Sequence, residues 1–346
     1  MKLKESVIVG ISVGDLNGIG PEIIIKAYED PRALELNTPV IFASSKTMQF
    51  FKNHFNSKIN FYNIDAPEKA VLGKVNVVNV WNEAVAIDFG KEDKKIGEYA
   101  IKSLEAATNA LKEGTIDVLV TAPINKHNIQ SDTFNFPGHT DYLAKALNGK
   151  SLMFMVSNAL RVGLLTDHVP LKDASNAITE DLINEKIATV TKSLKQDFGI
   201  RKPKVAVLAI NPHAGDNGVI GNEDDTILKP TLEKIKSEGN LVYGPYSADS
   251  FFGSNAYKNF DAIIASYHDQ GLIPFKTIAF GQGVNYTAGL NKVRTSPDHG
   301  TAYEIAGKGI ADEGSMKQAI YIAIQIFKQR EDHHFYSENP LKKGTR

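Results

Sequence analysis

Three histidines follow apolar, strand-like runs at widely separated places in the chain. The runs "RVGLLTDHVPL", "KVAVLAINPHAG" and "FDAIIASYHDQG" lead to His168, His213 and His268. Their short length and their Val, Leu and Ile content are typical of buried strands. In open α/β sheets ligands bind at the carboxyl ends of the strands, and neutral imidazole is a common ligand of zinc and similar ions. The pattern allows either one shared metal site or three separate structural histidines.

Three acids in the neighbouring segments could take part in such a metal site. They are Asp167, Asp249 and Asp269. A carboxylate can bind a metal ion directly or orient an imidazole that binds it. Taken singly, each of these acids is explained equally well as a solvated loop residue.

A second group of residues could bind an anion. The stretch "FPGHTDYLAKAL" places His139 and Thr140 at the start of an expected helix. The free N–H groups and the positive dipole end of a helix N-terminus suit a phosphate or a carboxylate, although capping by Thr140 is the simpler explanation. An arginine fork matches the oxygens of the same anions, whereas a lysine acts as a point charge. Further candidates for anionic or polar contacts are Lys276, Asn285 and Arg294.

Two strand-end loops add further candidates. "VTAPINKHNI" places Lys126 just beyond an expected strand, where it could transfer a proton, contact an anion or simply be exposed. His299, in "SPDHGTAYEIAG", could contact a cofactor or substrate or be structural. The loop "GDLNGIGPE" has three glycines, but their order is not the dinucleotide fingerprint G-x-G-x-x-G and it lacks the Gly-Lys-Ser/Thr of a P-loop. A tight strand-to-helix turn explains this loop most simply.

The bulk composition narrows the class of protein. A chain of 346 residues favours two domains, and a net charge of −1 gives no general attraction to nucleic acid or to a membrane surface. The absence of cysteine excludes disulfides, thiolate zinc sites and cysteine nucleophiles. The N-terminal residues resemble no signal peptide, and no apolar run approaches the roughly 20 residues that span a bilayer. We therefore expect a cytoplasmic protein.

The segments that must position these residues alternate between strand-like and helix-like patterns. This rhythm predicts an α/β fold with a largely parallel sheet covered by helices. We expect a helix closed by Gly114, a hairpin turning at Ser157-Asn158 and a long helix capped by Thr179. Helices are also expected in "GTAYEIAGKG" and "GSMKQAIYIAIQIFKQR" near the C-terminus.

Eight segments taken together resemble a known family. They are "GDLNGIGPEI", "TAPINK", "FPGHTDYLA", "DHVPL", "NPHAGDNGVIG", "GPYSADSFF", "YHDQGLIPFK" and "RTSPDHGTAYEIAGKG". In this order they are similar to the motifs of the 4-hydroxythreonine-4-phosphate dehydrogenases of pyridoxal 5′-phosphate synthesis. The resemblance runs from about residue 7 to about residue 328. One departure is Leu16-Asn17, where the family usually has Pro-Ala.

The resemblance implies a fold like that of the isocitrate and isopropylmalate dehydrogenases, with two α/β/α domains and a shared sheet. We place the first domain at residues 1–130 and 295–330, the second at 131–294, and a mobile tail at 331–346. The implied assembly is a homodimer with the site at the subunit boundary. The implied cofactors are NAD(P) and one divalent ion, zinc, magnesium or cobalt. No residue is assigned to the nicotinamide cofactor.

The resemblance also assigns roles to individual residues. His168, His213 and His268 match the metal ligands of the family. The residues that match its substrate contacts are His139, Thr140, Lys276, Asn285 and Arg294. Asp249 matches an acid close to the metal. Lys126 and a metal-bound water are both candidates to take the proton of the substrate hydroxyl.

The reaction that the resemblance implies is the oxidation of 4-phosphooxy-L-threonine to 2-amino-3-oxo-4-phosphooxybutanoate, which decarboxylates to 3-amino-2-oxopropyl phosphate. One alternative within the family is oxidation of a four-carbon sugar-acid phosphate, such as D-threonate or D-erythronate 4-phosphate. A three-histidine metal hydrolase and an inactive binding module are less favoured alternatives.

Overall fold

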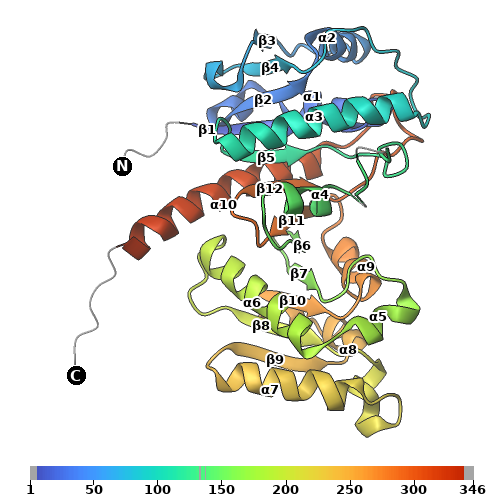
Figure 1. The fold of residues 1–346 in the computed structure, drawn as a ribbon, viewed down its shortest axis with the longest axis vertical. Coiled ribbons are helices and arrows are strands. Elements are labelled where there is room, and N and C mark those ends of the chain that lie inside the picture. The colour runs from blue at the N-terminus through green and yellow to red at the C-terminus, as the bar shows by residue number, and fades with distance from the viewer. Residues whose placement is uncertain (1–5, 132–133, 137, 339–346) are drawn as a thin grey trace. The chain divides into compact units, whose positions relative to one another are not determined.

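A computed structural model describes residues 6–131, 134–136 and 138–338 of the chain (Figure 1). The chain folds into two compact units. The first is Met1–Ser151 with Gly281–Ile324, and the second is Leu152–Phe280 with Gln325–Arg346. Residues 131–151 and 281–294 group with the first unit and residues 325–330 with the second, whereas the sequence-based boundaries placed each of these ranges in the other domain.

The first unit is built on a twisted sheet of mainly parallel strands. Their order is β3 (Phe61–Ile64), β4 (Val75–Asn79), β2 (Asn37–Ala43), β1 (Val7–Ser12), β5 (Val118–Thr121), β12 (Val293–Pro297) and β11 (Val284–Ala288). Among the described strands of this unit only β11 and β12 pair in antiparallel fashion, and β12 continues the sheet in parallel beside β5. This strand pairing explains why residues 284–294 belong to the first unit.

Helices cover the sheet of the first unit. They are α1 (Gly20–Ala27), α2 (Ser45–His54), α3 (Lys94–Glu113) and α4 (His139–Ala146), with short 3-10 turns at η1 (Pro31–Glu35) and η2 (Pro67–Lys69). Helix α3 begins at an Asp93 cap and ends at Gly114, which has the left-handed φ of 80° predicted for a C-cap. Leu119 of β5 lies in one apolar cluster with α3 and with Leu143 of α4. This shows that α3 and α4 cover the same face of the sheet.

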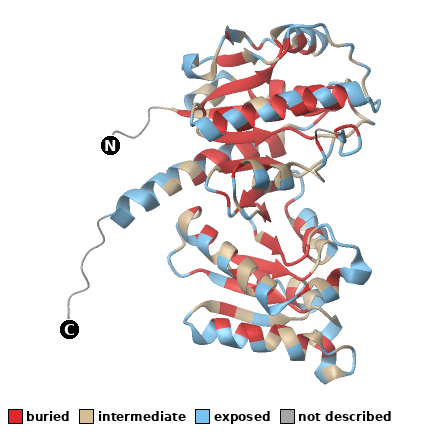
Figure 2. Ribbon diagram, viewed as in Figure 1, coloured by how far each residue is buried: buried red, intermediate tan, exposed pale blue. Residues whose placement is uncertain are grey.

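The second unit is likewise built on hydrogen-bonded strands. Its strand order is β6 (Leu152–Val156), β7 (Arg161–Leu164), β10 (Ala262–Ala265), β8 (Lys204–Leu208) and β9 (Leu241–Tyr246). Strands β6 and β7 form the predicted antiparallel hairpin, and β7, β10, β8 and β9 run parallel. The buried strand residues and Phe275 form its core, coloured red in Figure 2.

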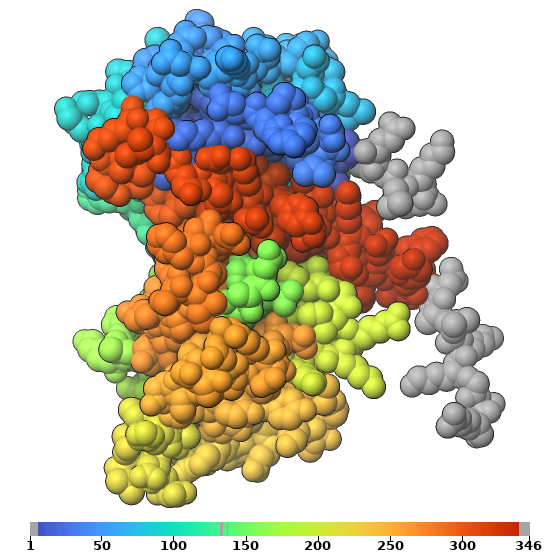
Figure 3. Space-filling model, turned by 180° about the vertical axis from the view of Figure 1, so that it is seen from behind, coloured from blue at the N-terminus to red at the C-terminus, as the bar shows by residue number. Residues whose placement is uncertain are grey.

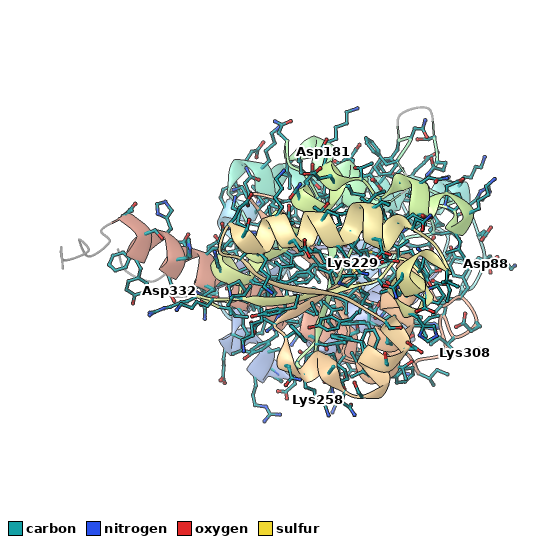
Figure 4. All side chains as sticks on the ribbon, turned by 90° about the horizontal axis from the view of Figure 1, so that it is seen from below. Asp88, Asp181, Lys229, Lys258, Lys308 and Asp332 are labelled. Carbon is teal, nitrogen blue, oxygen red and sulfur yellow. The ribbon has the colours of Figure 1, made fainter. Side chains whose placement is uncertain are left out.

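The helical segments of the second unit connect these strands. They are α5 (Leu171–Ala177), α6 (Glu180–Gln196), η3 (Pro212–Gly218), η4 (Asp224–Leu228), α7 (Lys229–Ser237), α8 (Ala248–Gly253), η5 (Ala256–Asn259) and α9 (His268–Ile278). Helix α6 begins as predicted, because the Thr179 hydroxyl accepts a hydrogen bond from the Leu182 N–H at 3.2 Å. Charged side chains of both signs, among them Asp181 and Lys258, point outward (Figure 4).

The C-terminal region differs from the sequence expectation. The stretch Gly300–Gly309 is not a helix but a series of turns, in which Gly307 and Gly309 have positive φ values of 75° and 71°. Figure 3 shows this orange-red region against the blue N-terminal segment, where Lys26 Nζ donates to the Gly309 carbonyl at 3.0 Å. Helix α10 (Gly314–Glu338) extends into the predicted tail, where its residues are exposed (Figure 2). Residues 339–346 of that predicted tail lie outside the described residues.

No helix in the described part of the chain is both long enough and apolar enough to cross a membrane.

Candidate active site

A buried arginine without an acidic partner lies in the sheet of the first unit. Arg294 of β12 is 1% exposed. Its Nε and Nη2 donate to the Thr121 hydroxyl at 3.2 and 2.6 Å, and Nη1 donates to the Thr287 hydroxyl at 3.0 Å. Among the described residues, no carboxylate pairs with this guanidinium. Burial lowers the pKa of Arg294 to about 9, so the side chain is still charged near neutral pH.

A buried cation that has only hydroxyl partners is energetically unfavourable, because burial removes water and no opposite charge replaces it. A bound anion would supply the missing opposite charge, so we take Arg294 as the centre of a candidate anion site in the first unit.

The register of three strands places the arginine and its partners on one face of the sheet. Arg294 lies opposite Leu119 of β5, and Thr121 is two residues further along that strand. Because side chains alternate between faces along a strand, Thr121 lies on the same face as Leu119 and Arg294. Asn285 of β11 lies opposite Ser296 of β12, which is two residues from Arg294. By the same alternation Asn285 shares this face.

His139 lies at the edge of this anion site. It is the first residue of α4, and its Nε2 atom is buried without a hydrogen-bond partner in the described chain. Burial lowers the pKa of His139 well below 6.5, with smaller contributions from the positive charges of Arg294 and Lys126. Because His139 is neutral, it adds no positive charge of its own, and it can donate its ring N–H to a bound anion.

Asn285 and Lys126 are two further residues near this candidate anion site. The Asn285 Oδ1 atom is also buried without a partner. Because amide nitrogen and oxygen are assigned by their surroundings, a bound anion can turn the Asn285 N–H groups toward itself. Lys126 follows β5, and its Cε atom would lie 3.8 Å from a Cβ built on Gly138, so it reaches the start of α4.

The structure corrects one sequence interpretation here. Thr140 does not cap α4, because Gly138 is the N-cap residue and no side chain accepts a hydrogen bond there. The N–H groups of the first turn are therefore not occupied by a side-chain cap. This arrangement favours the anion-binding interpretation of "FPGHTDYLAKAL" over the capping interpretation.

The three strand-end histidines all lie in the second unit. They follow β7, β8 and β10, which are neighbours in the parallel part of that sheet. The rings of His168 and His268 have their centroids 6.1 Å apart. His268 Nδ1 lies 2.7 Å from an Asp269 carboxylate oxygen, a contact that orients the ring and leaves Nε2 available.

His213 lies close to Asp249. The pKa of Asp249 is lowered chiefly by a hydrogen bond from the Ser247 hydroxyl, and the nearby His213 contributes a smaller lowering. Within the described residues of one chain, no group of three or more His, Asp or Glu side chains is close enough to hold a metal ion. The imidazoles have the right chemistry for a divalent ion, and their role as a set stays a prediction.

The loop that carries His213 has an unusual backbone. Residues 213–217 all have positive φ, with values of 52° at His213 and 45° at Asp216. This left-handed conformation costs about 1–2 kcal/mol per non-glycine residue, so the surroundings must impose it. The fully buried Asp224 does so in part, because its carboxylate accepts hydrogen bonds from the N–H groups of Ile210 and Asn211 at 2.8 and 2.9 Å.

Sequence reasoning missed Asp224 as a residue that shapes the His213 loop. The signal was the run of three acids in "GNEDDT" a few residues after "NPHAGDNG". A carboxylate there can close the loop only if it is buried, and burial of a single acid cannot be read from a polar stretch.

The other predicted site residues are divided between the two units. Lys276 is exposed in the last turn of α9, and Asp249 lies in α8, both in the second unit. Lys126, His139, Thr140, Asn285 and Arg294 are in the first unit.

Comparison with known proteins decides the family. The family described as "Pyridoxal phosphate biosynthetic protein PdxA" matches residues 35–323. This chain belongs to the PdxA family. A relative from Bacteroides thetaiotaomicron, named 4-hydroxythreonine-4-phosphate dehydrogenase, is 48% identical over 337 residues, 97% of this chain and 93% of the relative. The resemblance drawn from the motifs is therefore confirmed.

Solved structures of the PdxA family have the same fold. The crystal structure of 4-hydroxythreonine-4-phosphate dehydrogenase from Klebsiella pneumoniae matches with a TM-score of 0.80 at 30% identity, over 94% of this chain and 99% of that one. A more divergent relative, from Oceanobacillus iheyensis, has a name that places it with the D-threonate 4-phosphate dehydrogenases. It is 36% identical over 324 residues, 92% of this chain and 97% of the relative. The predicted α/β fold and the predicted enzyme class, an oxidoreductase, are confirmed.

The first loop of this PdxA protein shows what its departure from the usual Pro-Ala does. The Asn17 side chain donates to the Lys91 carbonyl at 2.9 Å and accepts from the Asp88 N–H at 3.0 Å. Asn17 is buried, and its own N–H donates to the Asp15 carboxylate at 2.9 Å. The asparagine therefore ties the first loop to residues 88–91, a contact that alanine cannot make.

The low pKa of His139 predicts a specific pH dependence of stability. In the folded protein His139 stays neutral below pH 6.5, whereas in the unfolded chain it takes up a proton. The wild type should therefore lose stability as the pH falls below about 6.5, by at most about 1.4 kcal/mol per pH unit from this group. Urea unfolding at pH 7.5 and 5.5 should show a smaller loss for His139→Gln than for the wild type. An equal loss in both proteins would contradict a neutral His139 in the folded protein.

Proposed function

We propose that this protein oxidises 4-phosphooxy-L-threonine with NAD(P) and a divalent metal ion, in pyridoxal 5′-phosphate synthesis. The observation that carries the proposal is the buried Arg294, which has no carboxylate partner in the described chain and is bordered by unpaired polar atoms of His139 and Asn285. A phosphorylated amino acid supplies the anionic oxygens that such a site lacks. The family relatives named for this activity support the same substrate.

The chain's own residues then have the following roles. Arg294 and Asn285 hold anionic or polar ends of the substrate, and the fork of Arg294 fixes their direction. His139 and Thr140 present the start of α4 to the phosphate, and Lys276 adds a positive charge. Lys126 is our candidate to accept the proton of the C3 hydroxyl group. Asp249 is the second candidate, through its position beside His213.

Two bound groups would supply chemistry that side chains cannot. A divalent ion held by His168, His213 and His268 would lower the pKa of a coordinated hydroxyl group. A bound nicotinamide cofactor would supply the hydride acceptor for the oxidation at C3. The C3 hydroxyl carbon would become a carbonyl, and the resulting β-keto acid would lose its carboxylate as CO₂ and take up a proton at C2 to give 3-amino-2-oxopropyl phosphate.

We also propose a homodimer. Each histidine-bearing segment of the second unit exposes apolar side chains: Leu171 at 71%, Val219 at 80% and Ile273 at 64%. Exposed apolar residues beside functional side chains are typical of protein interfaces. The described residues of one chain form no three-ligand cluster, and a second copy could complete it. A monomer in sedimentation equilibrium at assay concentrations would contradict this proposal. A cytoplasmic location stays a prediction.

A substrate panel tests the proposed function. We expect reduced nicotinamide to form with 4-phosphooxy-L-threonine at a kcat/KM at least about tenfold above that with D-threonate or D-erythronate 4-phosphate, since a site built to bind one polar group rejects an analogue lacking it. A chelator should stop the reaction and added zinc, cobalt or magnesium should restore it. A preference for the sugar-acid phosphates would favour the alternative dehydrogenase. Phosphate release without nicotinamide would favour a hydrolase.

A further inference from the structure

Ser12 has a buried hydroxyl group that nothing in the described chain binds. It is the last residue of β1 and is 1% exposed. Its carbonyl oxygen accepts a hydrogen bond from the Ala122 N–H at 3.0 Å, but its Oγ atom has no hydrogen-bond partner. Buried hydroxyl groups are normally paired, so an unpaired one requires an explanation.

Strand register places this hydroxyl group beside the anion site. Ser12 lies opposite Thr121 in the parallel pairing of β1 with β5. Directly opposed residues of neighbouring strands project from the same face of the sheet. Thr121 is the residue whose hydroxyl accepts the Nε and Nη2 hydrogen bonds of Arg294. Ser12, Thr121 and Arg294 therefore share one face on three consecutive strands.

A second buried serine, bonded to the residue that follows Ser12, has its hydroxyl group occupied. The hydroxyl group of Ser103, on α3, accepts from the Val13 N–H at 3.0 Å and donates to the Phe42 carbonyl at 2.6 Å. Ser103 is thus a buried serine of the same neighbourhood whose hydroxyl group is used within the fold. The fold uses the hydroxyl group of Ser103, whereas that of Ser12 has no hydrogen-bond partner in the described chain.

We propose that the Ser12 hydroxyl group is a further ligand of the anion that Arg294 binds. Its O–H would donate to an anionic oxygen, alongside the guanidinium and His139. The inference rests on the proposed function for the anion site, and it adds a residue from β1 to the proposed substrate contacts on β11, β12, α4 and α9. The ligand chemistry is an oxyanion, either the phosphate or the carboxylate of the substrate.

The proposal predicts opposite effects on binding and on stability. A hydroxyl group that has no partner in the free protein contributes nothing to folding, so Ser12→Ala should melt at the same temperature as the wild type or slightly higher. The same variant should bind its oxyanion about tenfold more weakly, since a hydrogen bond to a charged group is lost. Ser12→Thr, which retains the hydroxyl group, should restore binding.

Calorimetric titration with inorganic phosphate and with L-threonine, as a carboxylate probe, separates the two oxyanions. Ser12→Ala should lower the affinity for the same probe whose affinity Arg294→Met lowers. In steady-state kinetics Ser12→Ala should raise KM for 4-phosphooxy-L-threonine and leave kcat little changed. The matched control Ser103→Ala should lower the melting temperature and leave probe affinity unchanged.

Two results would overturn the role of Ser12. The first is wild-type affinity in Ser12→Ala where Arg294→Met binds weakly. The second is a fall in melting temperature as large as that of Ser103→Ala, which would show that the fold uses the hydroxyl group. If Arg294→Met binds both probes as the wild type does, the anion site itself is wrong and the proposed function fails with it.

Discussion

Replacing His213 by alanine is expected to abolish turnover and to weaken metal binding by more than about a hundredfold, a larger loss than removal of an outer-shell partner of a ligand causes. The ring is exposed at the end of the left-handed loop, so its removal opens no cavity in the core. The free energy of unfolding should therefore change by no more than about 0.5 kcal/mol. Metal titration of the purified protein, turnover and thermal unfolding measure the three quantities.

His333→Ala is a suitable control for the loss of an exposed histidine in the same unit. It lies on α10 and is exposed. It should bind metal and turn over substrate as the wild type does. Wild-type turnover or metal affinity in His213→Ala would defeat the metal assignment, whatever the control shows.

Replacing Arg294 by methionine is expected to lower kcat/KM by a factor of roughly 100 to 1000 without destabilising the protein. Two charge-assisted hydrogen bonds to an anion account for about 3–4 kcal/mol of binding in the transition state. Stability should be unchanged or higher, because an apolar side chain of similar volume replaces a buried charge that has no opposite partner. Steady-state kinetics and thermal unfolding test both parts.

Arg330 provides the matched control for Arg294. Arg330 is also largely buried, but its Nε donates to the Asp197 carboxylate at 2.7 Å, and Asp197 is 3% exposed. Arg330→Met leaves that acid without its cation, so it should destabilise the protein by about 3–5 kcal/mol with normal kcat/KM. The two arginines should therefore respond in opposite ways. An unchanged kcat/KM in Arg294→Met, or a destabilisation equal to that of Arg330→Met, would contradict the anion site.

Local chemistry in the sequence predicted many of the elements correctly. Gly114 ends α3 because only glycine readily takes the left-handed conformation there, and Thr179 caps α6 because its hydroxyl reaches the first turn. The β6–β7 hairpin turns where Ser157-Asn158 interrupts two apolar runs. Each of these features depends on residues a few positions apart, so the sequence contains the whole interaction.

Two local patterns were misleading. Residues 300–309 have helix-forming side chains, but the turns made by Gly307 and Gly309 and the contact of Lys26 with the Gly309 carbonyl hold them in an irregular path. The hairpin β11–β12 was divided between two expected domains, because nothing within residues 281–297 shows that β12 pairs with β5.

The sequence by itself determined which residues could do chemistry: three strand-end histidines, a helix start at His139 and an arginine among polar residues, in motifs specific enough to identify the PdxA family. Only the tertiary structure decided that Arg294 is buried without a carboxylate partner in the described chain, that Thr140 does not cap α4, and that Ser12 lies beside Thr121. The physical reason is that burial and pairing depend on strand register between segments more than 100 residues apart, which no local pattern encodes.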